Sequence, residues 1–138
     1  MQTKIYRQQH GDMRRELNDL RKTIMPLQPE EARARLARLA GLLKIHLAME
    51  DRALYPRMLT HGDPEVRQTA GEYQQSMGNL AQAFEAFYER WRKHGEIEAH
   101  ASEYADAYQA LAQALNRRMD LEDKNLYDLV DEKVDLAS

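Results

Sequence analysis

The stretch His46-Leu-Ala-Met-Glu50-Asp51-Arg-Ala-Leu54-Tyr55-Pro56 is nearly repeated 72 residues later, as Arg118-Met-Asp-Leu-Glu122-Asp123-Lys-Asn-Leu126-Tyr127-Asp128. The two patterns are H-x-x-x-E-D-x-x-L-Y and R-x-x-x-E-D-x-x-L-Y. Residues four apart lie on one face of a helix, with their Cβ atoms about 6 Å apart. An imidazole and a carboxylate at this spacing can bind one cation, so the first copy is a candidate metal site. The second copy carries a guanidinium where the imidazole would stand.

Apolar spacing, prolines and glycines predict four helices. We expect helices from Lys4 to Met25, from Pro29 to about Thr60, from Asp63 to a close at His94-Gly95, and from roughly Glu98 to Val134. We expect the second helix to bend near Pro56, because proline cannot donate a backbone hydrogen bond. No stretch alternates with period two, so no strand is expected. Short connections between long helices predict an all-α, up-down-up-down antiparallel four-helix bundle, with residues 1–138 as a single domain.

The composition excludes several classes of function. The chain has 138 residues, 43% of them apolar, and its 20 basic and 23 acidic residues give a net charge of -3. This balance provides no positive field for nucleic acid or an anionic membrane surface. No run approaches the roughly 18 apolar residues of a membrane span, and residues 1–7 contain no apolar segment of the kind that an export signal carries, so a cytoplasmic protein is expected. The chain has no cysteine, which excludes thiolate metal sites and cysteine nucleophiles.

Polar residues interrupt the apolar stripes at one level of the predicted bundle. Counting outward from each predicted turn, at about 1.5 Å per residue, brings them to the same height. They are His10, His46, Glu50, Arg118 and Glu122, and the third helix faces them with Tyr73, Gln74 and Met77. Burying such groups is costly unless each charge is paired or coordinates a metal.

Two arrangements satisfy this requirement. In the first, His10, His46, Glu50 and Glu122 bind one or two transition-metal ions, with Tyr73 as an additional phenolate. In the second, Arg118 is the cation, and its guanidinium bridges Glu50 and Glu122 while the histidines stay neutral. A mixed arrangement, with one metal and Arg118 in the other half of the site, is also chemically reasonable.

The order of these residues resembles the hemerythrin family, in particular bacterial HHE cation-binding domains. The resemblance covers nearly the whole chain, and its specific part is the element from His46 to Pro56. It implies a four-helix bundle with non-haem iron in its core, held by histidines and acidic residues from all four helices. Such proteins bind dioxygen, sense oxygen, redox state or nitric oxide, or act in iron handling and repair.

The resemblance implies four metal ligands in this chain, which are His10, His46, Glu50 and Glu122. The third helix has Tyr73, Gln74 and Met77 where the family has a histidine, and Arg118 stands in place of the histidine of the last helix. Two nitrogen ligands are therefore missing on the side of the third and fourth helices, and the metal nearer the first two helices is the one expected to remain.

Three hypotheses follow. The leading one is a hemerythrin-like protein, not an enzyme, that binds mono- or dinuclear iron and acts in oxygen, redox or nitric oxide sensing or in iron handling. The second is a metal-free descendant in which Arg118 fills the site and the domain acts as a regulatory protein-interaction module, with a homodimer or a regulatory protein as its partner. A di-iron oxidase or repair enzyme comes third, because no cleft above the two glutamates is indicated.

Overall fold

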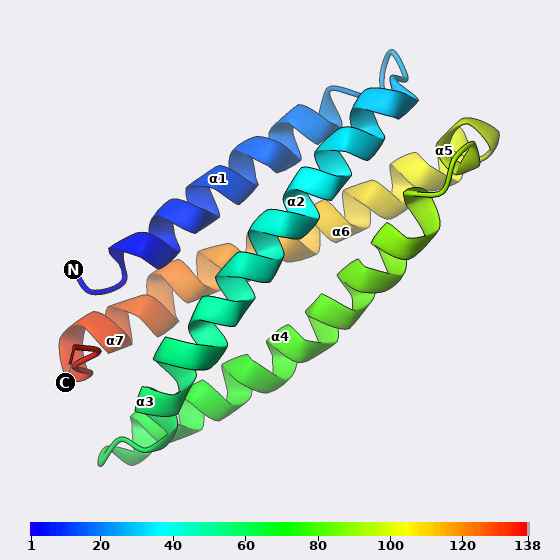
Figure 1. Ribbon diagram of the computed structural model, residues 1–138. Helices are drawn as coiled ribbons and strands as arrows, with labels where there is room; N and C mark the ends of the chain where they lie inside the picture. The colour runs from blue at the N-terminus through cyan, green and yellow to red at the C-terminus, as the bar shows by residue number, and fades with distance from the viewer. Residues whose placement is uncertain (138) are drawn as a thin grey trace.

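The computed structural model describes residues 1–137, and its long helices lie side by side as an antiparallel bundle (Figure 1). The elements are, in order, α1 (Lys4–Arg21), α2 (Pro29–Met49), η1 (Glu50–Leu54), α3 (Tyr55–Leu59), α4 (Pro64–Trp91), α5 (Glu96–Ala99), α6 (Ala101–Leu121), η2 (Glu122–Leu126) and α7 (Tyr127–Lys133). The elements η1 and η2 are single turns of π-helix, so α2–η1–α3 and α6–η2–α7 each run as one long helix. Residues 1–137 contain no strand. The predicted all-α four-helix bundle is therefore confirmed.

The predicted boundaries differ from the observed ones in the first and last helices. The helix α1 ends at Arg21 and not at Met25, because a turn begins there in which the hydroxyl of Thr23 donates to the Leu20 carbonyl at 2.6 Å. A residue before proline also disfavours helical backbone, and Met25 precedes Pro26. The last helix is interrupted as well, since the four-residue α5 stops before α6 begins.

Two π-turns interrupt the α-helical geometry of the two long helices, one of them directly before Pro56. Pro56 lies in the first turn of α3, inside this continuous helix, and it cannot donate a backbone hydrogen bond to the turn before it. The departure from α-helical geometry comes just before it, at Glu50–Leu54, and it recurs at the same position of the second copy, Glu122–Leu126. Single π-turns inside α-helices are frequent at functional sites.

Two apolar clusters fill the bundle, one toward each end. The first contains Met13, Leu17, Leu39, Leu43, Phe84, Trp91, Tyr104 and Met119 among others. The second contains Tyr6, Leu54, Tyr55, Met58, Val66, Leu126, Tyr127 and Val130 among others. Each buried Leu, Phe or Met side chain stabilises the fold by about 1.5–3 kcal/mol through loss of contact with water. The polar layer lies where the clusters meet, since along α1 His10 falls between Tyr6 of one cluster and Met13 of the other.

The helix α4 begins at the predicted position. The side chain of Asp63 accepts a hydrogen bond from the backbone N–H of Glu65 at 2.9 Å, and Pro64 is the first helical residue. Lys133 at the end of α7 donates to Asp63 at 2.8 Å and so ties the last helix to this turn. None of the helices in the described residues is both long and apolar enough to cross a membrane.

Candidate metal centre

Two imidazoles face each other in the polar layer. His10 on α1 and His46 in the last turn of α2 are both buried, and their Nε2 atoms lie 3.1 Å apart. The chain places them together because α1 and α2 form an antiparallel pair, and both residues stand on the inward stripe of their helix. The sequence-based prediction that these two residues share one level describes their position correctly.

A second hydrogen bond orients each ring. His10 Nδ1 lies 2.8 Å from Asp123 Oδ1, and His46 Nδ1 lies 2.7 Å from Gln9 Oε1. Because both partners are acceptors, each ring carries its proton on Nδ1 when neutral, and each Nε2 then presents a lone pair to the centre. Burial lowers the pKa of His46, which favours the neutral ring. Arg14 in turn donates to Asp123 Oδ2 at 2.7 Å.

Glu122 brings a carboxylate to the same point. Its Oε1 lies 2.8 Å from His10 Nε2 and 3.6 Å from His46 Nε2. Burial opposes ionisation of Glu122, but the contacts with His10 and His46 and the positive charge of Arg118 outweigh burial and hold the pKa of this carboxyl below its usual range. His10, His46 and Glu122 are all buried, and their ligand atoms lie within 4.8 Å of one another.

Glu50 lies beside this group, at the start of η1. Its Oε2 accepts a hydrogen bond from the Tyr127 hydroxyl at 2.6 Å. Its Oε1 has no hydrogen-bond partner and lies 3.4 Å from His46 Nε2. Burial, with the charge of Glu122 added, raises the pKa of Glu50 well above its ordinary value. The four residues that the sequence proposed as ligands are thus brought together, with Glu122 close to both imidazoles and Glu50 close to that of His46.

Tyr127 is a member of the centre that the sequence reasoning did not single out. Its buried hydroxyl oxygen lies 3.2 Å from Glu122 Oε1, 3.3 Å from His10 Nε2 and 3.4 Å from His46 Nε2. In an α-helix, Tyr127 would lie on a different face from Glu122, because the two residues are five positions apart. The π-turn η2 has more residues per turn, and the backbone N–H of Tyr127 bonds to the carbonyl of Glu122, five residues earlier. Both side chains therefore lie on the same face. The one signal in the sequence was the repeated tyrosine five residues after each glutamate.

Arg118 occupies the side of the centre that faces α4. Its Nε donates to Glu122 Oε2 at 3.0 Å, one terminal nitrogen donates to the Tyr73 carbonyl at 2.5 Å, and the other donates to the Ser76 hydroxyl. Its guanidinium carbon also lies 4.5 Å from the centre of the Tyr73 ring. The expected bridge to Glu50 does not form among the described contacts, because α4 takes the terminal nitrogens.

The residues proposed from the third helix lie around the centre without joining the donor atoms. The Tyr73 hydroxyl donates to the Leu121 carbonyl at 3.2 Å and therefore points away from the imidazoles. Met77 lines a cavity of about 10 Å³ beside His10 and His46, large enough for about one water molecule. Gln74 lines a separate crevice together with Tyr55.

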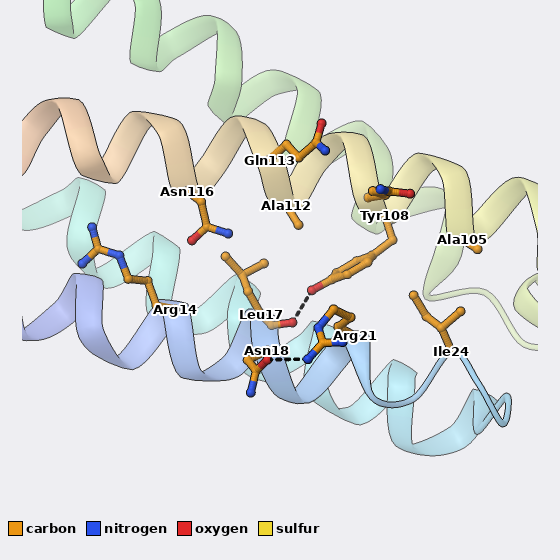
Figure 2. A pocket seen from close by; sticks show the side chains of 11 residues that line it. Arg14, Leu17, Asn18, Arg21, Ile24, Ala105, Tyr108, Ala112, Gln113 and Asn116 are labelled. Carbon is orange, nitrogen blue, oxygen red and sulfur yellow. Dashed lines mark hydrogen bonds between the residues drawn. The ribbon is translucent and has the colours of Figure 1, made fainter.

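A larger crevice of about 510 Å³ lies between α1 and α6 (Figure 2). Arg14 and Arg21 lie on its α1 side, and the Tyr108 hydroxyl crosses from α6 to the Leu17 carbonyl. Its lining contains no histidine or acidic residue, so it offers no set of metal ligands. Its relation to the centre is indirect, through the bond of Arg14 to Asp123.

An all-helical bundle with two buried imidazoles and a carboxylate converging between four helices defines a cation-binding helical protein. The family model of the hemerythrin HHE cation binding domain matches residues 1–130, and the chain belongs to this family. Comparisons with curated proteins gave no significant match, and neither did comparisons with solved structures.

Proposed function

We propose that the protein binds one non-haem iron ion, or a related divalent metal, between α1, α2 and η2, and that it acts in sensing oxygen, redox state or nitric oxide or in iron handling. The observation that carries this proposal is that the two oxygens of the Glu122 carboxylate have different partners. Oε2 is held by Arg118, while Oε1 faces the paired Nε2 atoms of His10 and His46. One side of the carboxylate is thus already neutralised, and the other is directed at the imidazoles.

The donor atoms fit a metal because each presents a lone pair and none carries a hydrogen to share with the others. With both Nδ1 protons donated outward, three acceptors, the two Nε2 atoms and Glu122 Oε1, lie within 3.6 Å of one another. Buried acceptors at such distances repel unless a cation lies between them. Imidazole with carboxylate oxygen suits iron, manganese and zinc, and the absence of cysteine leaves no softer donor.

A single ion is favoured over two by the residues on the α4 side. A second ion there would need ligands from α4 and from the position of Arg118, where the chain provides a fixed positive charge. Two like charges this close in a buried site repel strongly. The site proposed here therefore corresponds to the half of the centre formed by the first two helices.

The chain's residues supply orientation, charge balance and exclusion of water. Asp123 and Gln9 fix the imidazole rings, and Arg118 fixes the carboxylate of Glu122. The two apolar clusters close the layer from both ends of the bundle. A bound iron ion would supply one-electron chemistry and a position for a small ligand. A binding or sensing role is proposed over catalysis, because the cavity beside the donors has room for about one water molecule and no larger substrate.

The second candidate is a metal-free regulatory module, and one observation favours it. Arg118 already gives Glu122 a cationic partner, and Glu50 already accepts from Tyr127. In this alternative Arg118 remains the cation of the site, no metal binds, and the domain acts through contacts with another protein.

Elemental analysis after purification with iron supplied separates the two candidates. The first predicts about one equivalent of metal in the wild type, lost in His46→Gln and retained in the exposed-histidine control His94→Gln. Less than about a tenth of an equivalent in the wild type, with no change in His46→Gln, would end the metal hypothesis and leave the regulatory module.

A further inference from the structure

Four atoms at the centre form a nearly regular tetrahedron. They are His10 Nε2, His46 Nε2, Glu122 Oε1 and Tyr127 Oη, and the six distances between them are 2.8, 3.1, 3.2, 3.3, 3.4 and 3.6 Å. A regular tetrahedron with edges of about 3.2 Å has its centre about 2.0 Å from every corner. That is the length of metal–nitrogen and metal–oxygen bonds at tetrahedral sites.

We propose that Tyr127 is the fourth protein ligand of the metal, its phenolate oxygen completing a tetrahedral set of two nitrogens and two oxygens with His10, His46 and Glu122. This inference rests on the proposed function, since it concerns the same ion. It goes further by assigning a ligand that the sequence pattern places outside the site.

Hydrogen bonding alone does not account for these contacts. The phenol has one hydrogen, and its shortest contact, at 2.6 Å, goes to Glu50 Oε2. The remaining contacts of Tyr127 Oη, at 3.2 to 3.4 Å, then have no hydrogen of their own. A metal ion among the four atoms would give each of them a bonding partner at once.

The equivalent tyrosine of the first copy shows that the motif does not by itself produce this placement. Tyr55 also stands five residues after its glutamate, follows a π-turn and is buried. Its hydroxyl is buried and has no hydrogen-bond partner among the described residues, whereas the Tyr127 hydroxyl lies against both imidazoles. Tyr55 is therefore a matched control for Tyr127, with the same residue type, the same burial and the same position in its repeat.

Binding through the phenolate requires the loss of one proton. The phenol O–H bond breaks, the metal–oxygen bond forms, and the proton moves along the existing hydrogen bond to Glu50 Oε2, without any transfer of electrons. For a divalent ion, the charges of the Glu122 carboxylate and the Tyr127 phenolate together equal that of the metal, and Arg118 beside Glu122 adds one positive charge to the buried group. The role of Glu50 in this arrangement is to accept the proton next to the metal.

Visible spectroscopy of the ferric protein tests the assignment. A phenolate bound to iron(III) gives a ligand-to-metal charge-transfer band in the visible region, which imidazole and carboxylate ligands do not produce. We expect this band in the wild type, in Tyr55→Phe and in Tyr73→Phe, and we expect it to disappear in Tyr127→Phe, with circular dichroism confirming that each variant is folded. Resonance Raman spectra of wild-type protein made with ring-deuterated tyrosine provide a readout that does not depend on a variant folding, because phenolate modes coupled to the iron shift on deuteration.

The outcomes are distinguishable from a failure of the proposed function. Absence of any bound metal in the wild type overturns the proposed function itself. Metal in the wild type without the charge-transfer band, or a band that survives in folded Tyr127→Phe, overturns the assignment of Tyr127 alone. A band lost in Tyr73→Phe and kept in Tyr127→Phe would place the phenolate on α4 and equally refute the assignment.

Discussion

Arg118 and Glu122 form a buried ion pair one helical turn apart, with Arg118 Nε 3.0 Å from Glu122 Oε2. The glutamate is 1% exposed and the arginine side chain 10%, so neither charge is well hydrated. This pair lies where the second copy of the repeat departs from the first, and it places a positive charge on the side of the centre that faces α4.

Replacing Arg118 by Leu is expected to destabilise the metal-free protein by about 3–5 kcal/mol, because the buried carboxylate of Glu122 loses its fixed counter-charge. Urea denaturation followed by circular dichroism measures the change in the free energy of unfolding. The neighbouring Arg117 is exposed, and Arg117→Leu is expected to change stability by no more than about 0.5 kcal/mol. Equal stability of the two variants would show that Arg118 does not balance the site.

Arg118→His is expected to raise the amount of metal bound per chain. The substitution removes the positive charge from the α4 side and places an imidazole four residues before Glu122, which reproduces the spacing of His46 and Glu50. Elemental analysis beside the wild type and Arg118→Gln checks this, since glutamine removes the charge without adding a nitrogen ligand. The same metal content in all three folded proteins would contradict the expectation.

Much of this centre could be predicted from the sequence. The levels of His10, His46, Glu50 and Glu122 follow from helix lengths and turn positions, because antiparallel neighbours place residues equidistant from a turn at one height. Asp123 lies outside the donor atoms and contacts the outer nitrogen of His10, Nδ1.

The position of Tyr127 could not be predicted in this way. Helical spacing assigns a face on the assumption of 3.6 residues per turn, and a single π-turn invalidates that assumption for every residue beyond it. The direction of the Arg118 side chain could not be predicted either. It is set by hydrogen bonds to the Ser76 hydroxyl and the Tyr73 carbonyl on α4, and the spacing of apolar residues gives no information about these polar groups.

The Asp63–Lys133 contact gives a pH dependence outside the metal centre. Hydrogen bonds from Lys133 and from the backbone N–H of Glu65 lower the pKa of Asp63 below its ordinary 3.8. A carboxyl whose pKa is lower in the folded state stabilises the fold above its unfolded pKa, and the contribution is lost as the pH falls through the folded value. Thermal unfolding of wild type and Asp63→Asn should therefore differ near neutral pH and converge below about pH 4. A difference that persists undiminished in acid would assign the effect to capping geometry alone.

Asp123→Ala is expected to weaken metal binding by about 10–100-fold, because His10 loses the acceptor that holds its proton on Nδ1 and keeps Nε2 free. Competition with a chelator of known affinity measures the change. Asp51 is the matched control, since it follows Glu50 as Asp123 follows Glu122 but is exposed. Asp51→Ala should therefore bind metal as the wild type does. If both variants weaken binding equally, the effect comes from the loss of acidic charge near the site and not from the orientation of His10.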